Sequence, residues 1–395
     1  MLKRSWQKKG LFTAVMTTVV TVPHGAAEET SWAEALRLEA HGFASFGYLQ
    51  TEGNNWLGQT ENGTSEFWEA AANVIARPWD HVRIGAQIFA RDLVKYDNGQ
   101  PSLDWAYIDY RATDAIGVQV GRFKLPLGLY NEALDIDSAR ASIFLPPSVY
   151  SLRSRDLYIS TDGAKAYGLL DIGGGGSLEY AAYGGKKEFS MDAGFATYVS
   201  ELGVGDHVDD IVMDWQAGGF LHWHTPLDGL GLRLSGTYID DFTADAFFTS
   251  SGLASYTRAD YIFAFVSAIY EMSEVTIAAE YLRLRGRGET NVPGASLVIP
   301  LIDNYEGTYI NTTWHAASWL DCFVGVEGAW VDASDRDGTR AYTWVAAVNL
   351  MPLSNWSLKV EFRDVYGELG INKGDNPGGI ENHWQVLALK TTVDF

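Results

Sequence analysis

The segment HWQVLALKTTVDF (383–395) ends the chain and decides how the rest of the sequence is interpreted. Mostly apolar residues occupy alternate positions, at Leu387, Leu389, Thr391, Val393 and Phe395. Polar residues stand between them, at Lys390, Thr392 and Asp394. A period of two predicts a β-strand with one apolar and one polar face. Terminal residues are usually poorly ordered, so a strand that reaches a final aromatic residue is unusual.

The same alternation recurs along the chain. Examples are HVRIGAQIFAR (81–91), GLRLSGTYI (231–239), RAYTWVAAVNL (340–350) and NWSLKVEFR (355–363). In the last of these, Trp356, Val360 and Phe362 share one face, and Lys359 and Glu361 share the other. Each such strand is about ten residues long, the length with which a tilted strand crosses a bilayer.

The connections between these strands fall into two kinds that alternate strictly. Short turns lie at 78–80, 113–115, 173–176, 225–229, 271–274, 315–318 and 351–355. Longer polar loops lie near 51–63, 95–102, 125–160, 187–210, 243–254, 287–303, 333–339 and 367–382. They join sixteen strands, and both chain ends fall on the short-turn side. Because lipid tolerates no open sheet edge, the last strand must pair with the first, 41–50.

These patterns predict an all-β fold, a transmembrane antiparallel β-barrel of sixteen strands. The third long loop, 125–160, is expected to fold inward from the extracellular side. The alternative is a soluble β-sandwich or a secreted β-solenoid, in which strands average five to six residues and loop lengths need not alternate.

The N-terminus predicts export. Basic residues precede the apolar segment LFTAVMTTVVTV (11–22), which is too short to span a bilayer, and small residues follow it; this is the pattern of a secretory signal peptide. We expect residues 1–27 to be removed, 28–40 to form a short periplasmic segment and 41–395 to form the barrel. Removal of 1–27 takes away four basic and no acidic side chains, which leaves 25 basic and 50 acidic ones. A net charge of −25 argues against nucleic acid as a partner.

Taken together, the signal peptide, the strand pattern and the terminal Phe395 resemble Gram-negative outer-membrane porins. That resemblance implies that Phe395 is a C-terminal signal read by the outer-membrane assembly machinery. Locally, VGRFKLPLGLY (120–130) resembles the GRxKxPxGL stretch of porins related to the phosphate-selective family. The resemblance further implies a homotrimer in contact with lipid and lipopolysaccharide, and passive diffusion of small hydrophilic solutes or ions without a cofactor.

The loop at 125–160 resembles a porin constriction loop in position and length. It is unusually apolar for a surface loop, which favours packing against an inner wall. The candidate pore-constriction residues are Arg91, Arg122, Lys124, Glu132, Asp135, Asp137, Arg140, Arg153 and Arg155. The face of Arg122 and Lys124 stays open, because they share the parity of Val118 and Val120 and an inward direction needs a bulge at Gly121. Acids on the loop opposite bases on the wall would set up a transverse field that sorts ions and polar solutes. Alternatively, these charges pair with one another and pin the loop, and the two roles are compatible.

Anion or cation preference stays open at this stage. The acidic outer loops, with Asp206, Asp209 and Asp210 in one, favour cations. The constriction motif favours anions, and Arg283, Arg285 and Arg287 are expected at the outer rim, where they attract anionic solutes or lipopolysaccharide phosphates.

Other chemistry finds little support. His222 and His224 have a spacing that permits metal binding, but no third ligand is evident, so no metal site is predicted. The acidic stretch 332–338 lacks the spacing of an EF-hand, although a looser divalent site between acidic loops stays open. An outer-membrane enzyme, such as a phospholipase or protease barrel, needs a Ser/His or Asp/His constellation that the sequence does not assemble. A non-conducting surface anchor is the third class, and no catalytic residue is predicted.

Overall fold

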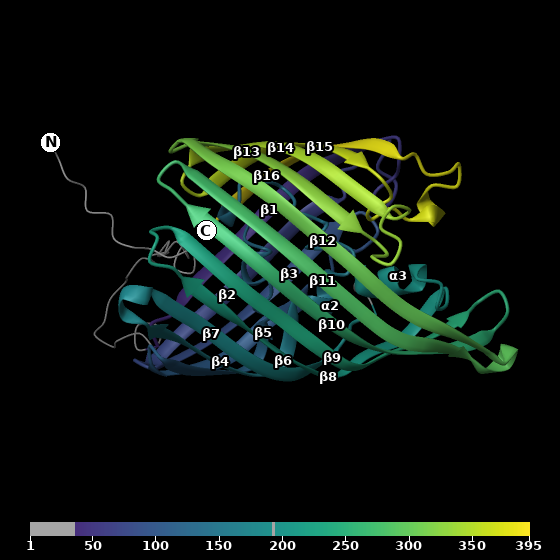
Figure 1. Cartoon of the computed structure of the whole chain (residues 1–395), viewed down its shortest axis with the longest axis horizontal. Coiled ribbons are helices and arrows are strands. Elements are labelled where there is room, and N and C mark those ends of the chain that lie inside the picture. The colour runs from purple at the N-terminus through teal and green to yellow at the C-terminus, as the bar shows by residue number, and fades with distance from the viewer. Residues whose placement is uncertain (1–35, 192–193) are drawn as a thin grey trace, which may run out of the picture.

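In the computed structural model, sixteen antiparallel strands close into one barrel (Figure 1). The structure describes residues 36–191 and 194–395. The predicted signal peptide, 1–27, and most of the predicted segment 28–40 lie outside the described residues. The first strand begins at Glu39, two residues earlier than predicted. The sixteen-stranded antiparallel barrel is confirmed.

The strands follow one another around the barrel in chain order. They are β1 (Glu39–Glu52), β2 (Phe67–Trp79), β3 (Val82–Leu93), β4 (Ser102–Thr113), β5 (Ile116–Lys124), β6 (Ser160–Asp171), β7 (Ser177–Glu188), β8 (His207–His224), β9 (Leu230–Phe248), β10 (Leu253–Glu271), β11 (Val275–Val292), β12 (Leu297–Ala317), β13 (Leu320–Trp330), β14 (Arg340–Leu353), β15 (Trp356–Tyr366) and β16 (His383–Asp394). The helices are α2 (Arg155–Tyr158) and α3 (Gly194–Glu201), with 3-10 turns η1 (Asn131–Ala133), η2 (Asp137–Ala139), η3 (Gly173–Gly175), η4 (Pro293–Ala295) and η5 (Lys373–Asp375). Among the described residues, none of these helices has the length and apolar character needed to cross a bilayer.

The barrel closes where β16 pairs with β1. The register runs from Phe43 opposite Asp394 to Glu52 opposite Gln385. Beyond it, the backbone N–H of Gly42 donates to the carbonyl of Phe395, and the N–H of Phe395 donates back to Gly42, both at 2.9 Å. A Cβ on Gly42 would come within 2.6 Å of the Phe395 ring, so glycine leaves room for that ring. The alternating segment 383–395 thus satisfies the last open edge of the sheet.

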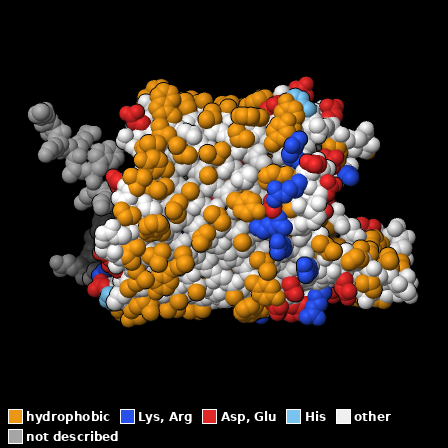
Figure 2. Space-filling view, viewed as in Figure 1, with side chains coloured by type: hydrophobic (Ala, Val, Ile, Leu, Met, Phe, Trp, Pro, Cys, Tyr) orange, Lys and Arg blue, Asp and Glu red, His pale blue; other side chains and the backbone are white. Residues whose placement is uncertain are grey.

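The two faces of the wall follow the predicted alternation. On β14, Tyr342, Trp344 and Val348 point outward and are exposed, whereas Thr343 and Val345 are buried inside. On β15, Lys359, Glu361 and Arg363 are buried inside. On the face of the barrel that Figure 2 shows, a broad band of apolar side chains is bordered by Lys and Arg side chains toward the end that carries the longer loops. An apolar outer band with a polar interior is typical of transmembrane barrels.

Two of the predicted long loops are wrong. Residues 243–254 and 287–303 belong mostly to β9, β10, β11 and β12, and the turns between these strands span only 249–252 and 293–296. Strands β8 to β12 have 18 to 21 residues, about twice the predicted length. Their ends project beyond the rest of the barrel (right in Figure 1). Beyond the apolar band the outward face carries residues such as Arg285 and Arg287, so hydrophobic alternation fades although backbone pairing continues.

Candidate functional site

Residues 125–159 connect β5 to β6, and the two ends of this segment lie side by side on the inside of the barrel wall. The N–H of Leu125 donates to the carbonyl of Ile159 at 3.0 Å. The buried amide of Asn131 donates to the carbonyls of Leu125 and Tyr158, at 2.9 and 2.8 Å. One asparagine therefore ties the two ends of this segment, which we call the inner loop.

The apolar residues of the inner loop pack against one side of the barrel. Leu125, Leu127, Leu129, Leu145, Val149, Tyr150, Leu157 and Tyr158 form one buried cluster with wall residues of β8 to β12, among them Ile211, Met213, Ile239, Phe242, Phe263, Leu282 and Tyr309. On the opposite side, Phe144 stacks on Phe67 at a centroid distance of 5.4 Å and meets Trp56 edge-on at 5.3 Å. Side chains therefore fill much of the interior at the level of the inner loop.

Glu280 on β11 binds the beginning of the inner loop. Its carboxylate accepts hydrogen bonds from the backbone N–H of Leu129 (2.9 Å) and from the hydroxyls of Ser267 (2.6 Å), Tyr150 (2.5 Å) and Tyr309 (2.6 Å). Burial and the nearby carboxylate raise the pKa of Tyr150, which keeps its hydroxyl a donor. Four hydrogen-bond donors compensate the burial of this carboxylate, which forms no ion pair among residues 36–191 and 194–395.

A second anchor lies on β13 and β15. Arg363 bridges two carboxylates, with Nε 2.7 Å from Glu361 and a terminal nitrogen 2.8 Å from Glu327. The free oxygen of Glu361 accepts the backbone N–H of Ile143 at 2.5 Å. Glu327 accepts the backbone N–H of Ser148 at 3.2 Å. The arginine thus holds two acids in place to bind backbone N–H groups of the inner loop.

The third anchor surrounds Asp137, whose side chain is fully buried. Its carboxylate lies 3.0 Å from Lys359 Nζ, 3.3 Å from Lys390 Nζ and 3.6 Å from the Arg140 guanidinium. The hydroxyl of Thr392 donates to it at 2.8 Å. Burial alone would raise the pKa of Asp137, but the surrounding cations lower it further than burial raises it. Asp137 is therefore ionised and ties the inner loop to β15 and β16.

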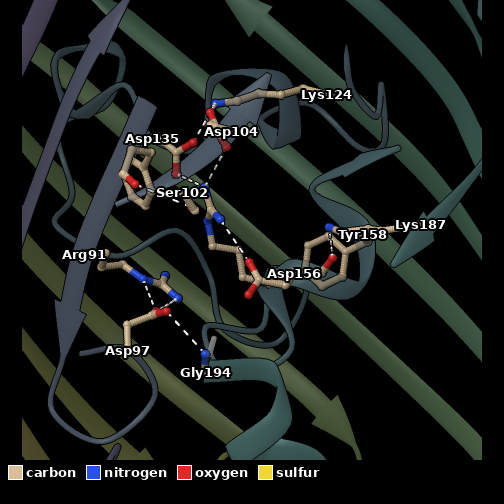
Figure 3. Close-up of polar contacts among 12 residues, drawn as sticks. Arg91, Asp97, Ser102, Asp104, Lys124, Asp135, Asp156, Tyr158, Lys187 and Gly194 are labelled. Carbon is tan, nitrogen blue, oxygen red and sulfur yellow. Dashed lines mark hydrogen bonds and ion pairs between the residues drawn. The ribbon is translucent and has the colours of Figure 1, made fainter. Parts of the chain in front are cut away.

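A fourth cluster joins the inner loop to β4 and β5 (Figure 3). Asp135 lies 2.5 Å from Lys124 Nζ and 2.6 Å from the Arg155 guanidinium. Both cations also approach Asp104, at 3.3 and 3.5 Å. In the pairing of β4 with β3, Trp105 lies opposite Gln87 and Leu103 lies opposite Ile88, so Asp104 has no partner in the register. This bulge turns the Asp104 carboxylate inward, and the lysine and arginine lower the pKa of Asp135 against the opposing effect of burial.

The inner loop also meets the outer loops. Arg153 donates to Glu201 of α3 at 2.6 Å, and Lys95 and Tyr96 contact the same carboxylate at 2.6 and 2.8 Å. Lys95 also pairs with Asp375 in the loop before β16. Three outer connections and the inner loop therefore share one polar junction.

The remaining predicted site residues divide between inside and outside. Arg91 is buried and its Nε donates to Asp97 at 2.6 Å (Figure 3). Glu132 lies 3.4 Å from Lys165 and 3.8 Å from Arg233.

The structure corrects the prediction that Arg122 belongs to the constriction, because this side chain lies on the outward face. It shares the outward parity of Val118 and Val120, of which Val120 is 54% exposed, and it binds Asp162 on the next strand at 2.7 and 2.8 Å. Pairing with β6 stays in register from Gly117 to Lys124, so no bulge turns Arg122 inward. Lys124 has the same parity but ends the strand, where its long side chain reaches the inner loop.

The local GRxKxPxGL stretch has structural roles at the beginning of the inner loop. The Pro126 carbonyl accepts a hydrogen bond from Arg233 at 2.9 Å. Gly128 has φ +59°, and a Cβ there would overlap the Tyr150 hydroxyl and lie 2.7 Å from Glu280 Oε2. With Arg122 outside and Lys124 paired to carboxylates, the stretch gives no sign of a phosphate-binding cluster among the described residues.

Sequence reasoning missed several of the anchoring residues. Asp104, Glu280 and Glu327 are not among the predicted site residues. The strand periodicity either places the side chain of each acid on the inward face or leaves its face undecided. Glu280 lies in VTIAAEYL (275–282), where one charge interrupts apolar residues. A lone acid on the inward parity of a barrel strand was the available signal. Its partner, however, lies far away in the sequence.

No protein-family model and no curated protein sequence matches the chain. Solved outer-membrane barrels match its fold. OmpF of Salmonella typhi, in a complex with daunomycin, has a TM-score of 0.57 at 13% identity, with 91% of this chain and 97% of that chain covered. The outer-membrane expressed OmpT of Vibrio cholerae has a TM-score of 0.55 at 13% identity over the same shares. The outer membrane channel DcaP of Acinetobacter baumannii has a TM-score of 0.52 at 9% identity, also with 91% and 97% covered.

The chain therefore has the fold of outer-membrane porins and channels, a closed sixteen-stranded antiparallel barrel. Sequence identities of 9 to 13% extend this likeness to the fold alone.

Proposed function

We propose that this protein is an outer-membrane porin that passes small hydrophilic solutes or ions by passive diffusion, with the inner loop as its constriction. The observation that carries the proposal is a segment held inside a closed barrel by ion pairs and hydrogen bonds to β4, β11, β13, β15 and β16. An apolar outside and a charged inside suit a barrel with lipid around it and polar solutes within it.

Charged groups from opposite sides meet at the constriction. Lys359 and Lys390 of the wall face Asp137 of the inner loop, and Lys124 and Arg155 face Asp104 and Asp135. Fixed charges at close quarters orient polar solutes and discriminate between ions. Diffusion down a gradient needs no catalytic residue and no cofactor.

The proposal places the chain in the bacterial outer membrane as a homotrimer in contact with lipopolysaccharide. It keeps Phe395 as the residue that the assembly machinery reads. In the barrel the Phe395 backbone also closes the seam with Gly42, so a Phe395→Ala variant, which keeps the backbone, separates recognition from closure. Reduced assembly with normal stability of the assembled fraction supports recognition.

Single-channel recording in a planar bilayer tests the proposal. We expect conductance in three equal steps from wild-type trimers. A variant without residues 135–142 should conduct more, because it lacks two anchoring carboxylates and the segment between them. The matched control lacks residues 332–339, a mostly exposed outer turn of the same length, and should conduct like the wild type. Equal conductance in all three proteins would show that the inner loop does not limit the pore.

A non-conducting barrel is the second candidate, and the packing of the inner loop favours it. The apolar cluster against β8 to β12 and the paired charges are also what a permanently closed barrel would contain. Folded wild-type protein that stays silent, beside a 135–142 deletion that conducts, would support this candidate.

An enzyme remains the third class, because the fold brings together a relay that sequence reasoning did not assemble. The Thr276 hydroxyl lies 3.2 Å from His315 Nε2, and His315 Nδ1 lies 2.8 Å from Asp321 Oδ1. A hydroxyl, an imidazole and a carboxylate in this order resemble a nucleophile with its base and orienting acid. Hydrolysis of lipid esters by the purified protein, lost in Thr276→Ala, would support hydrolase activity; equal rates for the variant and for wild type would argue against it.

A further inference from the structure

Glu179, His222 and His224 form a cluster on the inner wall near the short-turn end of the barrel. Glu179 on β7 lies opposite His222 in the strand register, and His224 follows two residues later on the same face of β8. The sequence predicted no metal site, because it offered no third ligand. The pairing of β7 with β8 supplies that ligand.

The distances suit a small ion. One ligand atom from each of the three residues lies within 4.8 Å of the other two. His224 Nε2 is 3.7 Å from Glu179 Oε2. Two ligands of a tetrahedral ion with bonds of about 2.1 Å are roughly 3.4 Å apart. Small side-chain rotations are enough to bring the three atoms to such an ion.

His222 provides an independent observation. It is 6% exposed, and neither of its ring nitrogens has a hydrogen-bond partner among residues 36–191 and 194–395. Buried polar groups are nearly always partnered, and its ring instead lies against that of His224, with centroids 4.2 Å apart. A buried imidazole with free nitrogens beside a second imidazole and a carboxylate has the chemistry of a metal ligand.

The neighbouring strand leaves room for this imidazole. Gly231 on β9 lies opposite His224, and a Cβ there would come within 2.5 Å of His222 Nε2. Its φ lies outside the left-handed region, so backbone conformation alone does not require glycine here. The adjacent cation, Arg233, is directed to the inner loop, where it donates to the Pro126 carbonyl at 2.9 Å.

We propose that Glu179, His222 and His224 bind one divalent transition-metal ion of the Zn²⁺ class. Two imidazoles and one carboxylate favour Zn²⁺ over Ca²⁺ and Mg²⁺, which take mainly oxygen ligands. Three protein ligands leave a coordination position open toward the lumen, because Glu179 and His224 are partly exposed. The site is independent of whether the barrel conducts.

Titration of the purified, folded protein in detergent with Co²⁺ tests the site. We expect one Co²⁺ per chain, with the visible absorption of a tetrahedral complex, and displacement by Zn²⁺. His224→Ala and Glu179→Gln should each weaken Zn²⁺ binding at least about 100-fold, since loss of a second-sphere partner alone costs 10- to 100-fold. His224 is partly exposed, so its variant keeps the test valid if the buried His222→Ala fails to fold.

The matched control is His383→Ala. His383, at the beginning of β16, also contacts one carboxylate, that of Asp364 at 2.8 Å. The His383→Ala protein should bind Zn²⁺ like the wild type, and heat-dependent migration in gels should confirm that each variant is folded. Wild-type protein that binds neither Co²⁺ nor Zn²⁺, or a His224→Ala variant that binds as tightly as wild type, would overturn the proposal.

Discussion

Replacing Asp137 by Asn probes how the inner loop is anchored. The side chain keeps its shape but loses its charge at the point where Lys359, Lys390 and Arg140 converge. In the wild type, Asp137 and Glu69 oppose these three cations, and Lys390 lies 2.7 Å from Glu69. The variant loses the Asp137 charge, so the local excess of positive charge grows by one.

The expected loss of stability is large. Removal of one partner from a buried ion pair costs about 3–5 kcal/mol, because the other charge stays buried without compensation. In the variant, Lys359 is the charge that stays fully buried without its anion, although its Nζ keeps donating to the backbone carbonyls of Asp137 and Arg140. The conductance should rise as the inner loop detaches from β15 and β16.

Ion selectivity should change in the same variant. A tenfold salt gradient gives about 59 mV across a perfectly selective pore, and we expect a shift of roughly 10 mV or more toward anions at low salt, where screening is weak. The measurements are urea unfolding of the refolded protein and the reversal potential in a planar bilayer.

Two further variants separate charge from packing. Thr392→Val removes a hydrogen bond to Asp137 and should lower the unfolding free energy by about 1.5–3 kcal/mol without changing the reversal potential. Asp337→Asn removes an acid from an exposed outer turn and should change neither the stability nor the conductance. Asp137→Asn with wild-type stability, conductance and reversal potential would refute the proposed anchor.

Three further predictions concern the inner loop and its surroundings. Gly128→Ala should cost about 1–3 kcal/mol and increase channel noise, because φ is positive there and the new methyl group would meet the Tyr150 hydroxyl; unchanged urea unfolding and quiet single channels would contradict this. Acidification should destabilise the barrel below about pH 5, since Asp135 and Asp137 have folded pKa values below the unfolded value of about 3.9; the unfolding free energy should fall by up to about 1.4 kcal/mol per pH unit for each carboxyl, and a flat profile from pH 6 to pH 3 would refute it. Arg122→Ala should leave conductance and reversal potential unchanged, because its side chain lies outside the barrel; a changed reversal potential would place it in the pore.

The sequence predicts much of the fold because strand periodicity is a local property. Alternation in 340–350 and 355–363 assigned both faces of β14 and β15 correctly. It failed for the ends of β9 to β12, where the outward face no longer needs to be apolar. For Arg122 the alternation was right, because its parity points outward; what failed was its inclusion among the constriction residues on the strength of the motif.

The candidate site was only half predictable. Asp135 and Asp137 stood out as acids within an apolar loop, and the inner loop does bring them to bases. Glu280 and Lys390 did not stand out, because nothing local distinguishes an inward charge that binds the inner loop from one that faces solvent. Glu179 gave no signal as a partner of His222 for the same reason, since only the strand register makes them neighbours.

By itself, the sequence determined the number of strands, their two faces within the apolar band and their order around the barrel. These follow from a period of two and from the need to pair every edge, which act between residues close in sequence or at the two ends of the sheet. The tertiary structure alone decided which charges meet. Ion pairs such as Lys359 with Asp137 join residues far apart along the chain, and their strength depends on burial and on distances of a few ångströms that no local pattern encodes.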